Sequence, residues 1–198
     1  MATPWITNVR NTKTLTVYNG VGGGHWANIF GIALSEFNTF AKPVGIKAVK
    51  TGDEDAANIV MRLGDGVVKY EYDKTKYERN FSGTALHGLT RALSRDGVIE
   101  KAFIFLPARP QVTVFDNKGN AHDVMASQGV MKVIAVHELI HASCLDEMSD
   151  HGGDGIFYYP MAYNQMGKVY VPEINKNQTP LPPIRPDSSI TGKMAALW

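Results

Sequence analysis

Residues 133–141 read VIAVHELIH, an apolar run interrupted by two histidines and one glutamate. His137 and His141 are four positions apart, so both would lie on one face of a helix. Apolar residues recur at helical spacing around them, which predicts a helix over approximately 125–145. The run is apolar enough for this helix to be buried, and unpaired histidines in a buried helix would be costly. We therefore expect the two histidine side chains to bind a shared partner.

The five residues 137–141 match the pattern H-E-x-x-H, in which the two imidazoles bind one zinc ion. A catalytic zinc keeps one position open for water, lowers the pKa of that water to about 7 and polarises the substrate carbonyl. Glu138 follows His137 directly, where it can take a proton from the zinc-bound water as a general base. The sequence thus predicts Zn²⁺ as cofactor and an enzyme, a zinc-dependent metalloendopeptidase that acts on a peptide or protein substrate.

A catalytic zinc site usually has three protein ligands, so one more is expected. His151 follows His141 in the glycine-rich segment 150–155, and it is the last histidine of the chain. Glycine tolerates backbone conformations that turn a chain sharply, so this segment can fold back under the helix. His151 is therefore the predicted third ligand. The competing carboxylates are Asp146, Glu147, Asp150, Asp154 and Glu173.

Residues 137–163 resemble the metzincin clan of zinc metallopeptidases, whose members extend the motif to H-E-x-x-H-x-x-G-x-x-H. In this chain Cys144 stands at the glycine position and Glu147 at the position of the third histidine. The resemblance implies an insertion of four residues that moves the third ligand to His151, with Glu147 as the alternative.

The segment 159–163, Tyr-Pro-Met-Ala-Tyr, resembles the metzincin Met-turn. In that clan a methionine forms an apolar floor beneath the zinc-binding histidines, and some members add a tyrosine two residues later. The resemblance implies that Met161 takes the first role and Tyr163 a catalytic one. A phenol at this place can donate a hydrogen bond to the charge that develops on the scissile carbonyl.

The pattern of the whole chain predicts an α+β fold: a twisted mixed β-sheet with a long N-terminal helix and an active-site helix. The order of these elements, a strand, a long helix, several strands and then the active-site helix, resembles that of metzincins, and the resemblance implies a zincin-like fold. The helices are expected near 26–40 and 125–145, and residues 86–93 are undecided between a short helix and irregular structure. The predicted strands are 15–18, 44–50, 57–63, 67–72, 102–106 and 112–115, the last ending in a hairpin turn.

Two parts of the chain are expected to differ in organisation. Residues 1–165 form the zincin-like metallopeptidase domain. Residues 166–198 form an extended, proline-rich tail that packs on the domain or on a protein partner. An extended substrate would add to an edge strand, for which 102–106 and 112–115 are the candidates.

Composition limits the classes of function. The formal net charge is +1 with both signs mixed along the chain, which predicts no nucleic-acid partner. No stretch approaches the roughly 18 apolar residues that span a bilayer, so no membrane insertion is expected. No signal peptide is visible, which favours a cytoplasmic or particle-associated protein over a classically secreted one. The alternative to an enzyme is a structural or assembly component, for example of a virus particle or secretion apparatus, that carries a metallopeptidase-like domain.

Overall fold

The computed structural model describes residues 3–116, 118–144 and 188–198. The chain is mixed α+β in these ranges, with one mixed five-stranded sheet and two separate hairpins. Its helices are α1 (Thr7–Thr12), α2 (Ile29–Ala41), α3 (Gln128–Cys144) and α4 (Ser188–Leu197), with short 3-10 turns η1 (Gly24–Trp26) and η2 (Lys42–Val44). Its strands are β1 (Thr14–Gly20), β2 (Lys47–Thr51), β3 (Ile59–Gly64), β4 (Gly66–Tyr72), β5 (Thr75–Phe81), β6 (Leu89–Arg95), β7 (Val98–Pro107), β8 (Gln111–Phe115) and β9 (Ala121–Met125).

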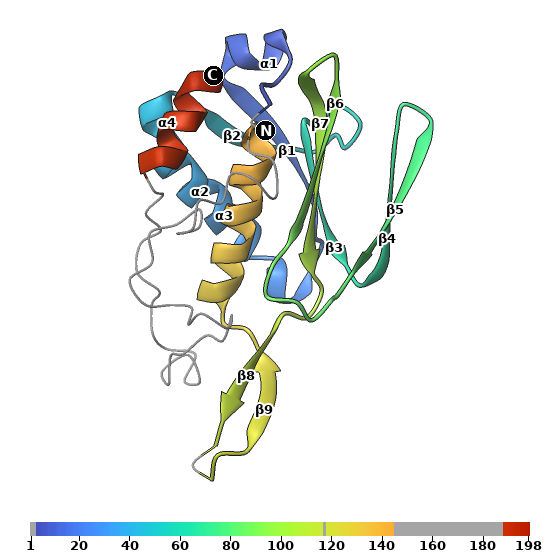
Figure 1. The fold of residues 1–198 in the computed structure, drawn as a ribbon, viewed down its shortest axis with the longest axis vertical. Coiled ribbons are helices and arrows are strands. Elements are labelled where there is room, and N and C mark those ends of the chain that lie inside the picture. Colours follow the sequence, from blue (N-terminus) through green and yellow to red (C-terminus); the bar gives the residue numbers. More distant parts are fainter. Residues whose placement is uncertain (1–2, 117, 145–187) are drawn as a thin grey trace.

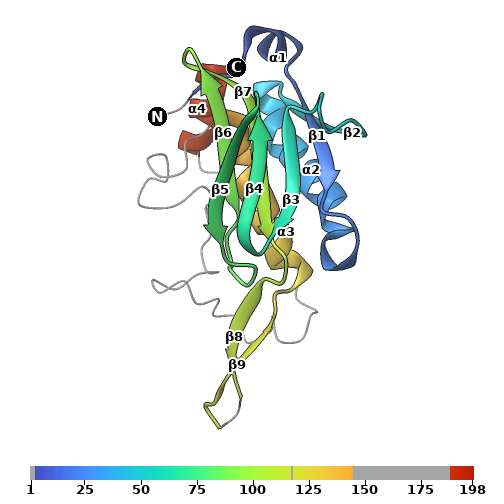
Figure 2. The same cartoon turned by 90° about the vertical axis from the view of Figure 1, so that its right-hand side faces the viewer.

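The main sheet has the strand order β2-β1-β3-β7-β6. The first four of these strands are parallel to their neighbours, and β6 runs antiparallel to β7 at one end of the sheet. The helices α2, α3 and α4 lie on one side of the sheet, whereas the hairpin β4–β5 stands on the other (Figure 1). A turned view shows β4 and β5 in front of the main sheet with the helices behind it (Figure 2).

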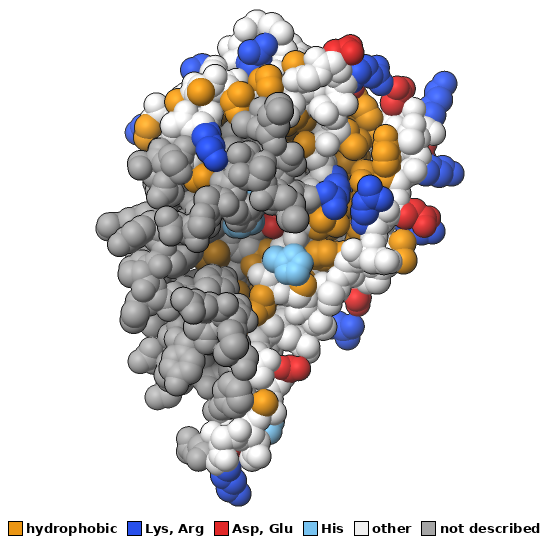
Figure 3. Space-filling view, viewed as in Figure 1, with side chains coloured by type: hydrophobic (Ala, Val, Ile, Leu, Met, Phe, Trp, Pro, Cys, Tyr) orange, Lys and Arg blue, Asp and Glu red, His pale blue; other side chains and the backbone are white. Residues whose placement is uncertain are grey.

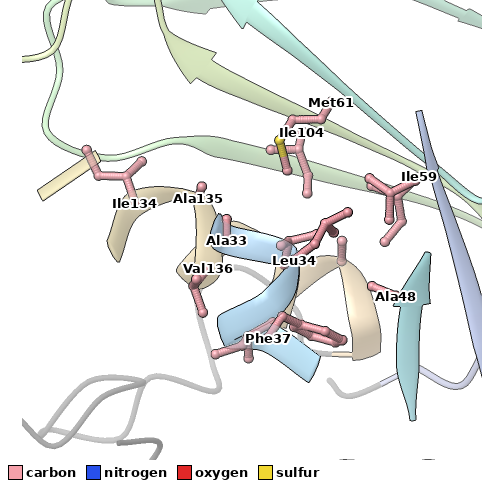
Figure 4. Packing of buried hydrophobic residues seen from close by; sticks show 14 of the residues in the cluster. Ala33, Leu34, Phe37, Ala48, Ile59, Met61, Ile104, Ile134, Ala135 and Val136 are labelled. Atoms are coloured by element: carbon pink, nitrogen blue, oxygen red, sulfur yellow. The ribbon is translucent and has the colours of Figure 1, made fainter. Parts of the chain in front are cut away.

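The main core fills the space between the sheet and the helices. The side chain of Phe37 from α2 is fully buried, as are Ile59 and Met61 from β3 and Ile104 from β7. Figure 4 shows these residues meeting the apolar face of α3. Helix α3 therefore packs on both α2 and the sheet, which fixes the orientation of the motif it carries.

The hairpin β4–β5 covers a second, smaller apolar cluster on the opposite face of the sheet. Tyr70 stacks on Tyr77 with ring centroids 5.0 Å apart, and it also contacts Phe103 and Phe105 of β7. Both faces of β7 are thus buried, which explains its continuous apolar run of residues 102–106.

The hairpin β8–β9 extends away from the body of the molecule, below the sheet and helices in Figure 1. Its turn is organised by Asp116, whose carboxylate accepts hydrogen bonds from the backbone and side chain of Asn120, both at 2.9 Å. The side-chain bond from Asn120 is the largest of the contributions that lower the pKa of Asp116 to about 2.

One outer edge of the sheet is blocked by a side chain. The Asn38 amide of α2 donates to the Ala48 carbonyl at 2.9 Å and accepts from the Ala48 N–H at 2.6 Å. An amide thus occupies the main-chain groups of β2 that a further strand would use. At the other end of the sheet, the outer edge of β6 pairs with no strand of the described ranges.

Several elements agree with the sequence prediction. The first predicted strand, the long helix ending near Pro43 and the hairpin near 112–115 are all present. The predicted start of the second helix at Met125 is wrong, because Met125 pairs with Gln111 in β9. The helix begins instead after Ser127, whose hydroxyl caps it by accepting the Val130 N–H at 3.3 Å.

Two further differences concern β6 and the chain end. Residues 89–95, within and beyond the undecided segment, form a strand because they pair with β7 along its length. The extended conformation predicted for 166–198 is wrong over 188–197, which form α4. Ile190 and Met194 lie four residues apart and are both buried, so tertiary packing favours a helix there. The proposed boundary at 165 is outside the described ranges.

Candidate metal centre

Helix α3 brings the two histidines of the motif together. The Nε2 atoms of His137 and His141 are 3.0 Å apart, with ring centroids separated by 4.7 Å. His141 is buried, and His137 is partly exposed. Two nitrogens bound to one tetrahedral zinc at about 2.0–2.1 Å would lie about 3.3 Å apart, so the observed separation is a few tenths of an ångström short of that value. The same separation also suits a hydrogen bond between the rings.

Glu138 points from α3 toward the edge strand β6 and is 3% exposed. The Thr90 hydroxyl lies 2.7 Å from Oε2 of Glu138 and 3.2 Å from the backbone carbonyl of the same residue. Thr90 is itself 3% exposed. Thr90 pairs with Ile104, which fixes its place in the sheet. It thus holds the carboxylate of the motif.

Gly88, just before β6, packs directly against the Glu138 side chain. A Cβ atom at position 88 would lie 2.8 Å from the carboxyl carbon of Glu138 and 3.0 Å from its Oε1. Cβ atoms essentially never come within 3.0 Å of another heavy atom in this way, so no larger residue fits without moving Glu138. The neighbouring His87 is exposed, and its ring stands edge-on to Phe81.

The end of α3 is held by tryptophans from distant parts of the chain. The indole N–H of Trp5 donates to the Ala142 carbonyl at 3.0 Å, and that of Trp198 donates to the Ser143 carbonyl at 3.1 Å. The last carbonyls of a helix have no partner within the helix, so these bonds satisfy groups that would otherwise be exposed or unpaired. They fix the turn that carries His141.

The surface beside the motif is formed by α3 and β6. A histidine side chain reaches the surface near the middle of this face, beside hydrophobic ones (Figure 3). The prediction that 102–106 is an edge strand is wrong, because β7 is paired with β3 on one side and β6 on the other. Among the described residues, β6 is the strand at the end of the main sheet next to the motif.

A hollow of about 390 Å³ adjoins the far end of β6, between the strand and the β4–β5 hairpin. Tyr72 and Glu100 face it, joined by a 2.7 Å hydrogen bond from the phenol to the carboxylate. Burial, followed by this hydrogen bond, raises the pKa of Tyr72 to about 12. Tyr72 therefore remains a neutral phenol over the physiological pH range.

The other predicted site residues fall outside the described ranges. These are His151, Tyr163, Met161 and the alternative ligand Glu147. Within residues 3–116, 118–144 and 188–198, no three side chains of His, Cys, Asp or Glu gather in a group suited to a metal. The described part of the centre therefore consists of the two histidines, with Glu138 directed to Thr90.

No protein family model matches the chain, and no curated protein matches its sequence. None of the helices in the described part of the chain is long and apolar enough to cross a bilayer.

Sequence reasoning did not find Thr90, Gly88, Trp5 or Trp198. The first two come from a segment that was undecided between helix and loop, and only the pairing of β6 with β7 brings it beside α3. The two tryptophans bond to carbonyls more than fifty residues away in the chain. No local sequence pattern predicts such contacts, although a buried indole N–H usually donates to a hydrogen-bond acceptor.

Proposed function

We propose that the protein is a zinc-dependent metalloendopeptidase whose metal is held by His137, His141 and His151. The observation that carries the proposal is the convergence of the two Nε2 atoms to 3.0 Å on one face of a helix packed in the core. Zinc-binding histidines converge in this manner, and an H-E-x-x-H motif on a helix is the structural context that the chemistry needs.

The proposed fold is zincin-like, with the active-site helix α3 against a mixed sheet. Its support is the order of elements: a strand, the long helix α2, several strands and then the helix with the motif. This is the order that the resemblance to metzincins implies.

When bound, zinc would polarise the scissile carbonyl and make a water molecule acidic enough to attack at neutral pH. Glu138 accepts a proton from the attacking water as general base. The new C–O bond forms at the carbonyl carbon, the C–N bond breaks, and Glu138 passes the proton to the leaving amine. Tyr163 is proposed to donate a hydrogen bond to the charge on the former carbonyl oxygen.

An extended peptide is the proposed substrate, and β6 is its proposed docking strand. Its outer edge pairs with no strand of the described ranges, it lies beside Glu138, and main-chain pairing at a sheet edge is a common mode of peptide recognition. The opposite edge is less suited, since Asn38 occupies the main-chain groups of Ala48.

The experiment that tests the proposal combines metal analysis with Glu138→Gln. The purified wild type should bind about one zinc per chain, and a labelled casein should be cleaved. Glu138→Gln should keep the zinc and lose about 10²- to 10⁴-fold in rate, the usual contribution of a general base. His141→Ala should lose the metal. If the wild type takes up no zinc, or Glu138→Gln cleaves as fast as wild type, the proposal is wrong.

The second candidate, a structural or assembly component with a metallopeptidase-like domain, is favoured by one observation. Glu138 is 3% exposed and already bonded to Thr90, as a purely structural carboxylate would be. Under this alternative Glu138→Gln changes thermal stability but affects no peptide cleavage, because the wild type has none. The same pair of proteins therefore distinguishes the two functions.

A further inference from the structure

Glu138 is held from two directions by one short segment, residues 88–90. Gly88 limits the space beside the carboxylate, and Thr90 contacts one of its oxygens at 2.7 Å. Because Thr90 is 3% exposed, water does not readily replace its hydroxyl as a partner. The side chain of Glu138 is thus confined by sterics on one side and by a hydrogen bond on the other.

The segment that confines Glu138 leads into the edge strand of the sheet. Thr90 is the second residue of β6 and is paired with Ile104 of β7. Its hydroxyl reaches both the side chain and the backbone carbonyl of Glu138, so it ties β6 to α3 as well as orienting the carboxylate. The strand proposed to bind the substrate and the proposed base are therefore joined by one residue.

We propose that Thr90 and Gly88 are positioning residues that set the orientation of the Glu138 carboxylate toward a peptide bound along β6. The proposal rests on the function proposed above. It adds that the geometry of the base is set by the substrate-binding strand and not by α3 alone.

The decisive comparison is Thr90→Val with Thr90→Ser. Valine keeps the shape of threonine but removes the hydroxyl, while serine keeps the hydroxyl. Misplacing a catalytic group by about 1 Å costs on the order of 100-fold in rate. With an internally quenched peptide that the wild type cleaves, Thr90→Val should lower kcat by about 10- to 100-fold and leave KM within about twofold. Thr90→Ser should restore most of kcat.

Gly88→Ala tests the orientation of the same side chain by a steric clash alone. The added methyl group must displace Glu138, so kcat should fall while zinc content stays at the wild-type level. Gly52→Ala is the matched control, because no heavy atom lies within 4 Å of its Cβ position. Thr16→Val is the control for loss of a partly buried strand hydroxyl: Thr16 on β1 donates to Asn58 at 2.8 Å, away from the site.

A structural readout separates this proposal from the proposed function. Crystal structures should show the Glu138 carboxylate in a new orientation in Thr90→Val and Gly88→Ala, and in its original one in Thr90→Ser. If the carboxylate stays in place in both variants, or if Thr16→Val lowers kcat as much as Thr90→Val, the positioning role is refuted. If the carboxylate moves but the wild type cleaves no peptide, the proposed peptidase fails while the positioning contact stands.

Discussion

Replacing Trp5 with phenylalanine should destabilise the protein and weaken its metal site together. Trp5 is fully buried, and its indole N–H donates to the Ala142 carbonyl, one residue after His141. Phenylalanine leaves that carbonyl without this donor, which costs about 1–3 kcal/mol, and the lost packing adds about 1 kcal/mol. We expect a loss of about 2–4 kcal/mol, and thus a Tm lower by roughly 4–16 °C for a domain of this size.

The matched control is Trp26→Phe. Trp26 is 1% exposed, and its indole donates to the Pro107 carbonyl at 2.8 Å, at the end of β7 and not on α3. Both variants lose a buried indole bond of similar length, so their thermal unfolding, followed by circular dichroism, should shift by similar amounts. They should differ in zinc affinity, measured by competition with a chromophoric chelator.

Trp5→Phe should bind zinc about 10-fold more weakly, since groups that orient metal ligands typically contribute 10- to 100-fold in affinity. Trp26→Phe should remain within about twofold of wild type. The reasoning is refuted if both variants weaken zinc binding equally, because the effect would then be a general loss of stability. It is also refuted if Trp5→Phe leaves the Tm unchanged.

Three further predictions concern the metal, the hairpin and the sheet edge. Removing zinc with a chelator should lower the Tm by roughly 5–11 °C if the metal was present at about 100 times its Kd, and the variant His137→Ala/His141→Ala should show no such shift. The pKa of Asp116 in the folded protein, about 2, lies below its usual value, so the turn is stabilised above about pH 4 and loses this stability as the pH falls toward 2. The NMR signal of the Asn120 amide should follow this titration. It should not do so in Asp116→Asn. Asn38→Leu should expose the main-chain groups of Ala48 and promote concentration-dependent association in size-exclusion chromatography, whereas an unchanged elution volume would contradict the role of Asn38 as an edge block.

Local patterns were sufficient for the elements whose periodicity comes from one buried face. The helix α2 and the strand β1 were predicted in this way, and the spacing of His137 and His141 correctly placed both on one side of a helix. The start of α3 was missed because Ser127 caps it only after β9 has ended at Met125. A cap and a competing strand partner are decided by contacts that a window of sequence does not contain.

The surroundings of the motif depend on contacts between distant segments. Thr90 meets Glu138 across 48 positions of the chain, through pairing that places β6 at the edge of the sheet. Residues 89–93 carry mixed signals, because one face of β6 meets α3 while Leu89 and Leu93 pack toward the β4–β5 hairpin. The helix α4 was missed for a similar reason, since its buried Ile190 and Met194 gain their support from the core.

The unequal edges of the main sheet have a consequence for how copies of the protein would meet. With Ala48 already satisfied by an amide, a neighbouring copy seeking a main-chain ladder would find β6 the more open strand of this sheet within the described residues. A peptide and a second copy would then compete for the same strand. At high protein concentration, pairing between copies would block peptide binding at β6, and dilution would restore it.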